Sequence, residues 1–213
     1  MEDFFRHVPV DEVIDIEAAA RVIYELRENR ADILNGHGVH DEGELLERIA
    51  QGSLPEHPAY DSYLSARIVA ETRELLRRQL ERHLSQVNGS RTEAAPIEEI
   101  DFSPAGIKRR LETAFSDRIE GEVLAARDAV LFKLDNGVIV ELKVLSPTEY
   151  AFGWLWGEAT LRIDTAPGAD RAASHFHDLE GNIRPDPVTV PGHPPLENID
   201  RLVKALLADP LLE

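Results

Sequence analysis

Four side chains that can do chemistry fall within 16 residues of the C-terminal half of the chain: Arg162, Asp164, His175 and His177. Alternate residues of a strand point to the same face, so Arg162 should share a face with Asp164, and His175 with His177. Paired imidazoles suit proton transfer near neutral pH, and an Arg fixed by a carboxylate suits phosphate. We therefore predict His175, His177 and Asp164 as catalytic groups and Arg162 as a substrate-binding residue.

Simpler explanations exist for each of these residues. A His-x-His pair is common on protein surfaces, and it also suits a metal ion, although we favour acid–base chemistry and expect neither a metal nor a cofactor. Arg162 and Asp164 can form an exposed pair worth less than about 1 kcal/mol. Trp154 is kept as a second candidate substrate-binding residue that stacks on a base, although the alternative, a place in the core, is the interpretation that we favour.

The composition narrows the class of protein. The chain has 213 residues, no cysteine and a net charge of −17, from 23 basic and 40 acidic residues. No segment approaches the roughly 18 apolar residues of a membrane span, and the acidic start is unlike a secretory signal. We expect a cytoplasmic protein that does not bind membranes. The acidity also disfavours nonspecific binding of nucleic acid, so RNA would need a local positive site.

The first 88 residues are predicted to be helical, because apolar residues recur there near 3.6-residue spacing. The first helix should end at Asn35-Gly36, a second should cover residues 44–50, and a third, the longest, should run from about Pro58 to Leu84. The apolar stripe of this third helix is the surface on which we expect a homo-oligomer to form.

The remaining chain is predicted to be a polar linker over residues 89–102 and an α+β domain over residues 103–213. Ser103-Pro104 should start a helix, with Ser as its N-cap. From residue 119 the apolar period changes from 3.6 to 2, which is typical of strands. A second amphipathic helix, residues 198–208, should close the chain.

The first predicted hairpin turns at Asp135-Asn136-Gly137. A two-residue turn would place Phe132 opposite Glu141 and bury a charge. A three-residue loop places Phe132 opposite Val140, so we favour that register.

A second hairpin turns at Gly157-Glu158, which places Trp154 opposite Leu161 and Arg162 opposite Gly153. A third turn, Glu180-Gly181-Asn182, should join the His175 strand to residues 188–190. The expected fold is therefore an N-terminal helical region followed by an antiparallel β-meander of five or six strands with flanking helices. These helices should cover one face of the sheet and leave the other polar and open.

The third helix also contains the Arg-x4-His motif of HEPN ribonucleases, as Arg78 and His83. The motif is short and arises by chance in an Arg-rich helix. We favour a solvated helix face, with His83 near the negative end of the helix dipole.

The C-terminal part resembles the TumE-like toxin family of bacterial toxin–antitoxin pairs. The similarity lies in Trp154 and Trp156, then Arg162-x-Asp164-x-Ala166-Pro167, then His175-x-His177, then a terminal helix; Thr165 stands where the family has Asn. It covers about residues 120–210 and leaves the helical half unexplained.

The resemblance implies a small α+β toxin that acts on RNA and is neutralised by an antitoxin protein. A toxin–antitoxin-related protein that acts on or binds RNA is accordingly our leading expectation. The alternative is a non-enzymatic interaction module that oligomerises through its helical half.

Overall fold

The computed structural model describes residues 10–87, 102–168 and 172–213, and it has the expected α+β architecture. The described helices are α1 (Val10–Gly36), α2 (Glu42–Ala50), α3 (Glu56–Val87), α4 (Pro104–Ala114) and α5 (Pro195–Ala208). The described strands are β1 (Ile119–Ala125), β2 (Val130–Leu134), β3 (Ile139–Ser146), β4 (Glu149–Trp156), β5 (Ala159–Asp164), β6 (His175–His177) and β7 (Ile183–Pro185). Among the described helices, none is long and apolar enough to cross a membrane.

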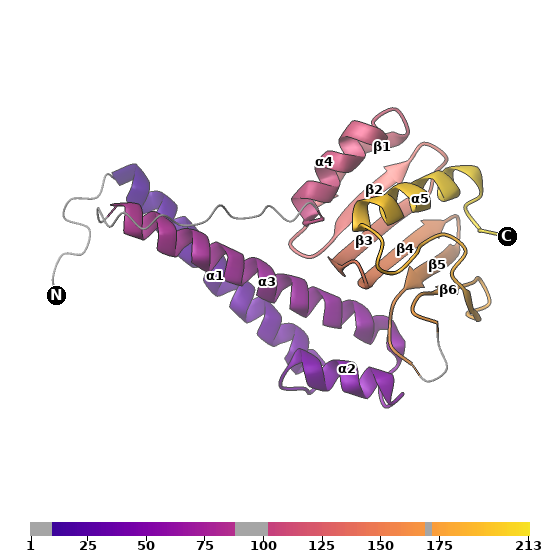
Figure 1. The fold of residues 1–213 in the computed structure, drawn as a ribbon, viewed down its shortest axis with the longest axis horizontal. Coiled ribbons are helices and arrows are strands. Elements are labelled where there is room, and N and C mark those ends of the chain that lie inside the picture. Colours follow the sequence, from indigo (N-terminus) through magenta and orange to yellow (C-terminus); the bar gives the residue numbers. More distant parts are fainter. Residues whose placement is uncertain (1–9, 88–101, 169–171) are drawn as a thin grey trace.

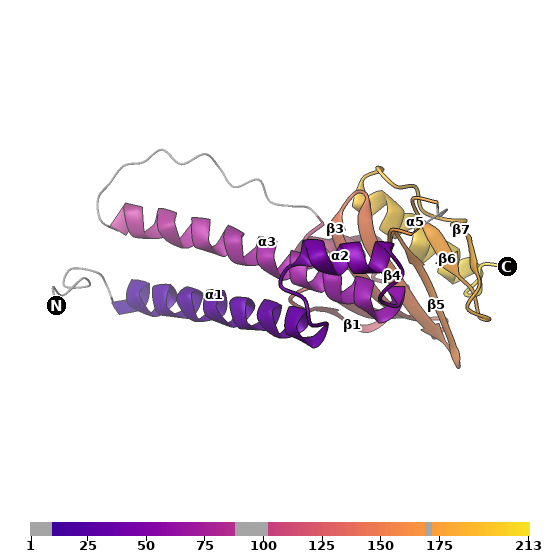
Figure 2. The same cartoon turned by 90° about the horizontal axis from the view of Figure 1, so that it is seen from below.

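The helical half is an arm that points away from the sheet (Figures 1 and 2). Helices α1 and α3 lie side by side along it, and α2 connects them at the end nearest the sheet. The α1 helix ends at Gly36, as the Asn-Gly pair predicted, and Asp41 caps α2 by accepting a hydrogen bond from the backbone of Glu44. The described residues therefore confirm the three predicted helices, each with slightly wider bounds.

The beginning of α3 is irregular at one residue. His57 has φ −104° and ψ 127°, because the residue before a proline is pushed out of the helical region. Glu56 therefore stands on the segment that leads into α3 rather than on its regular turns.

The seven strands pair antiparallel in chain order, from β1 at one edge to β7 at the other. Both predicted hairpin registers are confirmed. Phe132 pairs with Val140, and the Leu134 backbone bonds to Val138 across the three-residue loop. Trp154 pairs with Leu161, and Arg162 with Gly153, across a turn in which Gly157 has φ +62°. The sheet has one strand more than the upper limit of the prediction.

One face of the sheet is apolar and is covered by α4 and α5. Its alternating strand residues form one buried core with Ile107 and Leu111 of α4 and Leu202 and Leu206 of α5. Trp154 belongs to this core: it is only 2% exposed, and its indole N–H donates to the Pro210 carbonyl at 2.8 Å. This confirms the prediction that helices cover one face of the sheet.

The opposite face is not left open, which corrects the expectation from the sequence. The first half of α3 packs on β3 and β4, so α3 and α5 lie on opposite sides of the sheet (Figure 2). Tyr60, Tyr63 and Leu64 are buried there against Leu145 and Ala151 of the sheet. The stripe predicted as an oligomer surface is thus partly used within the chain itself.

The third predicted turn is confirmed only in part. The Gly181 backbone donates to Asp178, so the chain does reverse there, but the strand that follows is β7 and not residues 188–190. Thr189 instead bonds to Tyr150 through its hydroxyl at 2.7 Å, beyond the prolines that end β7. The predicted linker lies outside the described residues, except for Phe102.

Candidate functional site

Strands β5 and β6 bring the four predicted residues together on the face of the sheet that α3 covers. Arg162 pairs with His177, and Asp164 with His175, in the antiparallel register. Directly paired residues lie on the same face, so all four side chains point toward α3. The alternation that placed Arg162 with Asp164 and His175 with His177 is therefore confirmed.

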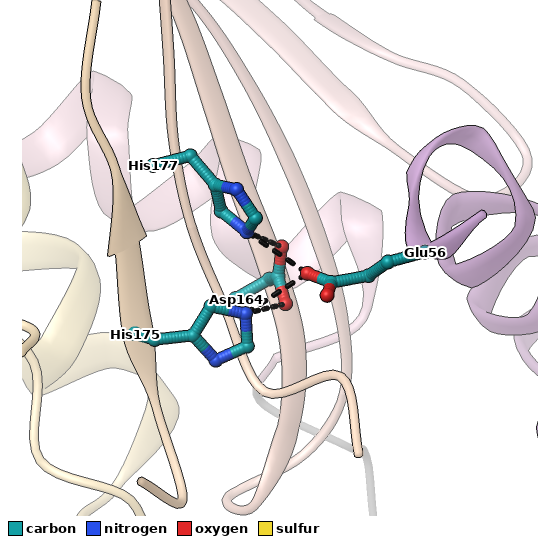
Figure 3. Close-up of side chains that lie close together, drawn as sticks. All are labelled: Glu56, Asp164, His175 and His177. Atoms are coloured by element: carbon teal, nitrogen blue, oxygen red, sulfur yellow. Dashed lines mark hydrogen bonds and ion pairs between the residues drawn. The ribbon is translucent and has the colours of Figure 1, made fainter. Parts of the chain in front are cut away.

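Glu56 completes this group from the other half of the chain. Its Oε1 atom lies 2.9 Å from Nε2 of His175 and 2.9 Å from Nε2 of His177 (Figure 3). The Asp164 carboxylate faces the same two nitrogens, at 3.3 Å from His175 and 3.5 Å from His177. Two imidazoles and two carboxylates therefore converge on one point between α3 and the sheet.

The sequence suggested that Arg162 lies open to solvent, but Arg162 is buried and bonds carboxylates through Nε and Nη1, while its buried Nη2 atom has no hydrogen-bond partner among the described residues. Its Nη1 atom donates to both oxygens of Asp61 on α3, at 2.8 and 2.6 Å, and its Nε atom to Asp164. The residue is 8% exposed and Asp164 is fully buried. The Arg162–Asp164 pair thus exists, but as part of a buried network.

The electrostatic balance of the site is negative. Glu56, Asp61 and Asp164 contribute three negative charges and Arg162 one positive charge, which leaves two negative charges while the imidazoles are neutral. Burial by itself raises the pKa of Asp164, but the His177 ring and the Arg162 guanidinium lower this pKa to about 2. Asp164 is therefore ionised at neutral pH.

The ionised carboxylates determine which ring nitrogens carry protons. A carboxylate accepts hydrogen bonds and donates none, so a proton on Nε2 of each ring suits the ionised Asp164 carboxylate that faces both rings. Each neutral ring then offers its donor to the same oxygen of Glu56. This arrangement can deliver or take up protons at one point, and it can equally present two nitrogen ligands there.

Further contacts hold α3 on this face. The hydroxyls of Tyr60 and Thr165 lie 2.9 Å apart, and Thr165 also accepts from the Tyr150 backbone. Thr165 is the residue that replaces Asn in the resemblance to TumE-like proteins. Lys143 on β3 donates to Ser65 of α3 at 2.7 Å and pairs with Asp128 at 3.1 Å. The helical half is thus joined to the sheet by side-chain hydrogen bonds as well as by apolar packing.

A cleft of about 620 Å³ opens beside α3 and reaches Arg162 and His177. Gly153 contributes to its floor, and no atom lies within 4 Å of where a side chain there would begin. The exposed side chains of Leu131, Ile139 and Leu155 line its outer part. Because Gly153 pairs with Arg162, the cleft leaves room beside the Arg162 side chain.

Two other sequence predictions lie away from the site. Trp154 points to the core face, so its side chain takes the place that the alternative interpretation gave it. Arg78 is exposed on α3 and donates to the Glu74 carbonyl one turn earlier, as on a solvated helix face. Glu56 and Asp61 were missed, because no short motif links them to β5 and β6.

Comparison with known proteins adds one match. Residues 10–88, which contain α1 to α3, are similar to the uncharacterized protein MJ0235 family. Neither a curated protein nor a solved structure matches the chain. The matched family is uncharacterized, so the match indicates no activity.

Proposed function

We propose that the chain is a toxin–antitoxin-related protein, similar to TumE-like toxins, that acts on RNA at the site between α3 and the sheet. One observation carries the proposal: the Arg, Asp and two His residues of the resemblance share one face and lie in register on β5 and β6. Residues that only shape a fold need not meet in this way, whereas residues that act on one bond must.

The cleft supplies the route by which RNA reaches these groups. It meets the site at Arg162 and His177, and the side chain of His177 is 21% exposed while that of His175 is 1% exposed. A phosphodiester that enters along the sheet therefore contacts His177 first. An antitoxin protein that fills the same cleft would block this approach.

The negative balance of the site opposes a bare phosphodiester. An approaching phosphate meets Glu56 and Asp61, and Arg162 is already paired with Asp61 and Asp164. Action on RNA thus needs either a shift of α3 or an added positive charge at the imidazoles.

The experiment compares RNA cleavage by the full chain and by the variant His175→Ala plus His177→Ala, with and without a divalent cation. The matched control is His40→Ala plus His193→Ala, which removes two exposed imidazoles away from the site. We expect cleavage by the wild type and the control and none by the site variant. Equal cleavage by all three proteins, or none by the wild type, would contradict the proposal.

A second function is favoured by the outer surface of the helical arm. Ile14, Val22 and Tyr24 of α1 are exposed, and the far part of α3 keeps Leu75, Leu76 and Leu80 only half-buried. Two helices side by side bury little surface, and a second arm packed on them would bury more. This proposal makes the chain a non-enzymatic module that forms a homo-oligomer through the arm.

The test of this second proposal is the oligomeric state. Light scattering after gel filtration should give a dimer or larger species for the wild type and a monomer for Val22→Glu plus Tyr24→Glu. The control Leu131→Glu changes an exposed residue on the sheet and should leave the oligomer intact. A monomeric wild type would contradict the proposal.

A further inference from the structure

Glu56, Asp164, His175 and His177 together form a set of donors suited to a metal ion. One ligand atom from each residue lies within 4.8 Å of the other three (Figure 3). The set mixes two imidazole nitrogens with two carboxylate oxygens. Such a combination is typical of sites for divalent transition metals. From this geometry we propose that the chain binds one divalent transition metal ion between α3 and strands β5 and β6.

The distances fit a tetrahedral ion of the size of Zn²⁺. Metal–ligand distances of about 2.0–2.2 Å in a regular tetrahedron give ligand–ligand edges of about 3.3–3.6 Å. Nε2 of His175 lies 3.3 Å from Oδ1 of Asp164, Nε2 of His177 lies 3.5 Å from Oδ2 of Asp164, and both Nε2 atoms lie 2.9 Å from Oε1 of Glu56. The Asp164 oxygens thus already lie at such distances from the two rings, and a small outward movement of Glu56 brings its oxygen to a similar distance.

The charges of the site also match a divalent cation. The three carboxylates and the single guanidinium leave two negative charges, and two of these carboxylates, those of Glu56 and Asp164, face the imidazoles. Buried like charges repel one another, and a doubly charged cation between them removes the repulsion.

Surrounding residues hold the ligands in place, as is usual for metal centres. Arg162 donates to Oδ2 of Asp164, and the Ala166 backbone donates to Oδ1 of Asp164 at 2.8 Å. The two histidines are fixed on β6 by their pairing with β5. Three of the four ligands therefore sit on a rigid sheet, and only Glu56 comes from the segment that leads into α3.

The donor types select the class of metal. Ca²⁺ and Mg²⁺ prefer all-oxygen sites, and a chain without cysteine offers no thiolate for softer ions. Two imidazoles with two carboxylates favour Zn²⁺, Co²⁺ or Mn²⁺. Each neutral ring binds as the other tautomer: Nε2 gives up its proton and Nδ1 takes one up, so the Nε2 lone pair is free for the ion and no net proton is released.

The metal changes the role of the histidines. Their Nε2 atoms become ligands, so His175 and His177 hold the cation and do not exchange protons with RNA. The cation cancels the two excess negative charges of the site, and so removes the repulsion that a phosphodiester would meet there. Because Glu56 belongs to one half of the chain and the other ligands to the sheet, the metal also fastens the two halves together.

Metal binding is tested on the full chain after treatment with a chelator, by titration with ZnCl₂ in a calorimeter. We expect one Zn²⁺ per chain and a rise in melting temperature on binding. His177→Ala and Glu56→Gln should each weaken the affinity at least about tenfold. The controls His193→Ala and Glu47→Gln change exposed residues of the same types and should bind as the wild type does.

A second measurement does not depend on how well the variants fold. The wild type loaded with Co²⁺ should show the intense visible absorption of a tetrahedral ion with nitrogen and oxygen ligands. The proposal is overturned if the wild type binds no Zn²⁺, if Co²⁺ stays octahedral, or if the site variants and the controls bind equally well.

The metal site stands or falls separately from the proposed action on RNA. Zn²⁺ binding without RNA cleavage supports the site and contradicts the action on RNA. Cleavage by the chelator-treated protein without Zn²⁺ binding does the reverse, and it restores the acid–base roles predicted from the sequence. Cleavage that is lost with the chelator and returns with Zn²⁺ supports both proposals.

Discussion

The two faces of the β-sheet are both covered, but by different means. The face under α4 and α5 is built from aliphatic and aromatic side chains that interlock in one core. The face under α3 combines a small apolar cluster with Arg162, Asp164 and His175, which are all buried. The apolar face therefore gains stability from surface removed from water, whereas the polar face depends on every buried charge having a partner.

This difference bears on where function can reside. An apolar core tolerates exchange of similar residues and has no reactive groups, so its residues report on folding. The polar face buries charges at a cost that a purely structural contact does not need. Its charged groups meet at one point beside a cleft, so the candidate site lies on this face.

The largest effect on the free energy of unfolding should follow loss of the Arg162 guanidinium from the polar face. Arg162→Met leaves Asp61 and Asp164 without their shared partner, and Asp164 is fully buried. We expect the free energy of unfolding to fall by about 3–5 kcal/mol in chelator-treated protein. Urea denaturation followed by circular dichroism measures this loss.

The matched control for that variant is Arg127→Met. The guanidinium of Arg127 is half exposed and pairs with Glu25 on α1. Its loss should cost less than about 1 kcal/mol, because exposed ion pairs contribute little. If both variants lose the same small amount, the charges of the polar face are solvated, and the contrast between the two faces disappears.

A smaller difference in the free energy of unfolding is expected between alanine variants of two leucines that lie on opposite faces of neighbouring strands. Leu161 is 1% exposed in the core, and Leu155 is 44% exposed beside the cleft. Leu161→Ala should reduce the free energy of unfolding by about 2–5 kcal/mol through the cavity it leaves. Leu155→Ala should change it by less than about 1 kcal/mol. Similar losses in the same denaturation experiment would mean that the cleft side is also packed.

The apolar face could be predicted from the sequence because its determinants are local. Alternation of period 2 and the turn residues around Gly137 and Gly157 were enough to set the pairing of Phe132 with Val140 and of Trp154 with Leu161. A slip of one residue would turn every apolar side chain outward, so the pattern admits few registers. For the same reason, the sequence correctly placed Arg162 with Asp164 on one face and His175 with His177 on one face, but it did not show that the two pairs share a face.

The other half of the site could not be predicted because its determinants are distant. Glu56 reaches the histidines across more than 100 residues of chain, and Asp61 reaches Arg162 across a similar separation. Both stand among many acidic residues in a chain with 40 of them, so nothing local distinguishes them. The long stripe of α3 indicated a partner surface, but it did not show that this surface lies within the same chain.

The smallest effect concerns pH and tests the attachment of α3 to the sheet. Asp128 is more than half buried, which opposes ionisation, but bonds from Ser65 of α3 and Lys143 of β3 leave its pKa below the ordinary value. A lowered folded-state pKa adds stability above the unfolded value of about 3.9, and this stability is lost as the pH falls through the folded value.

Asp128→Asn should therefore be less stable than the wild type at pH 7, by about 1 kcal/mol. The difference should shrink below pH 4, as measured by urea denaturation at each pH. A difference that stays constant down to pH 2 would show that the Asp128 carboxylate does not help to hold α3 on the polar face.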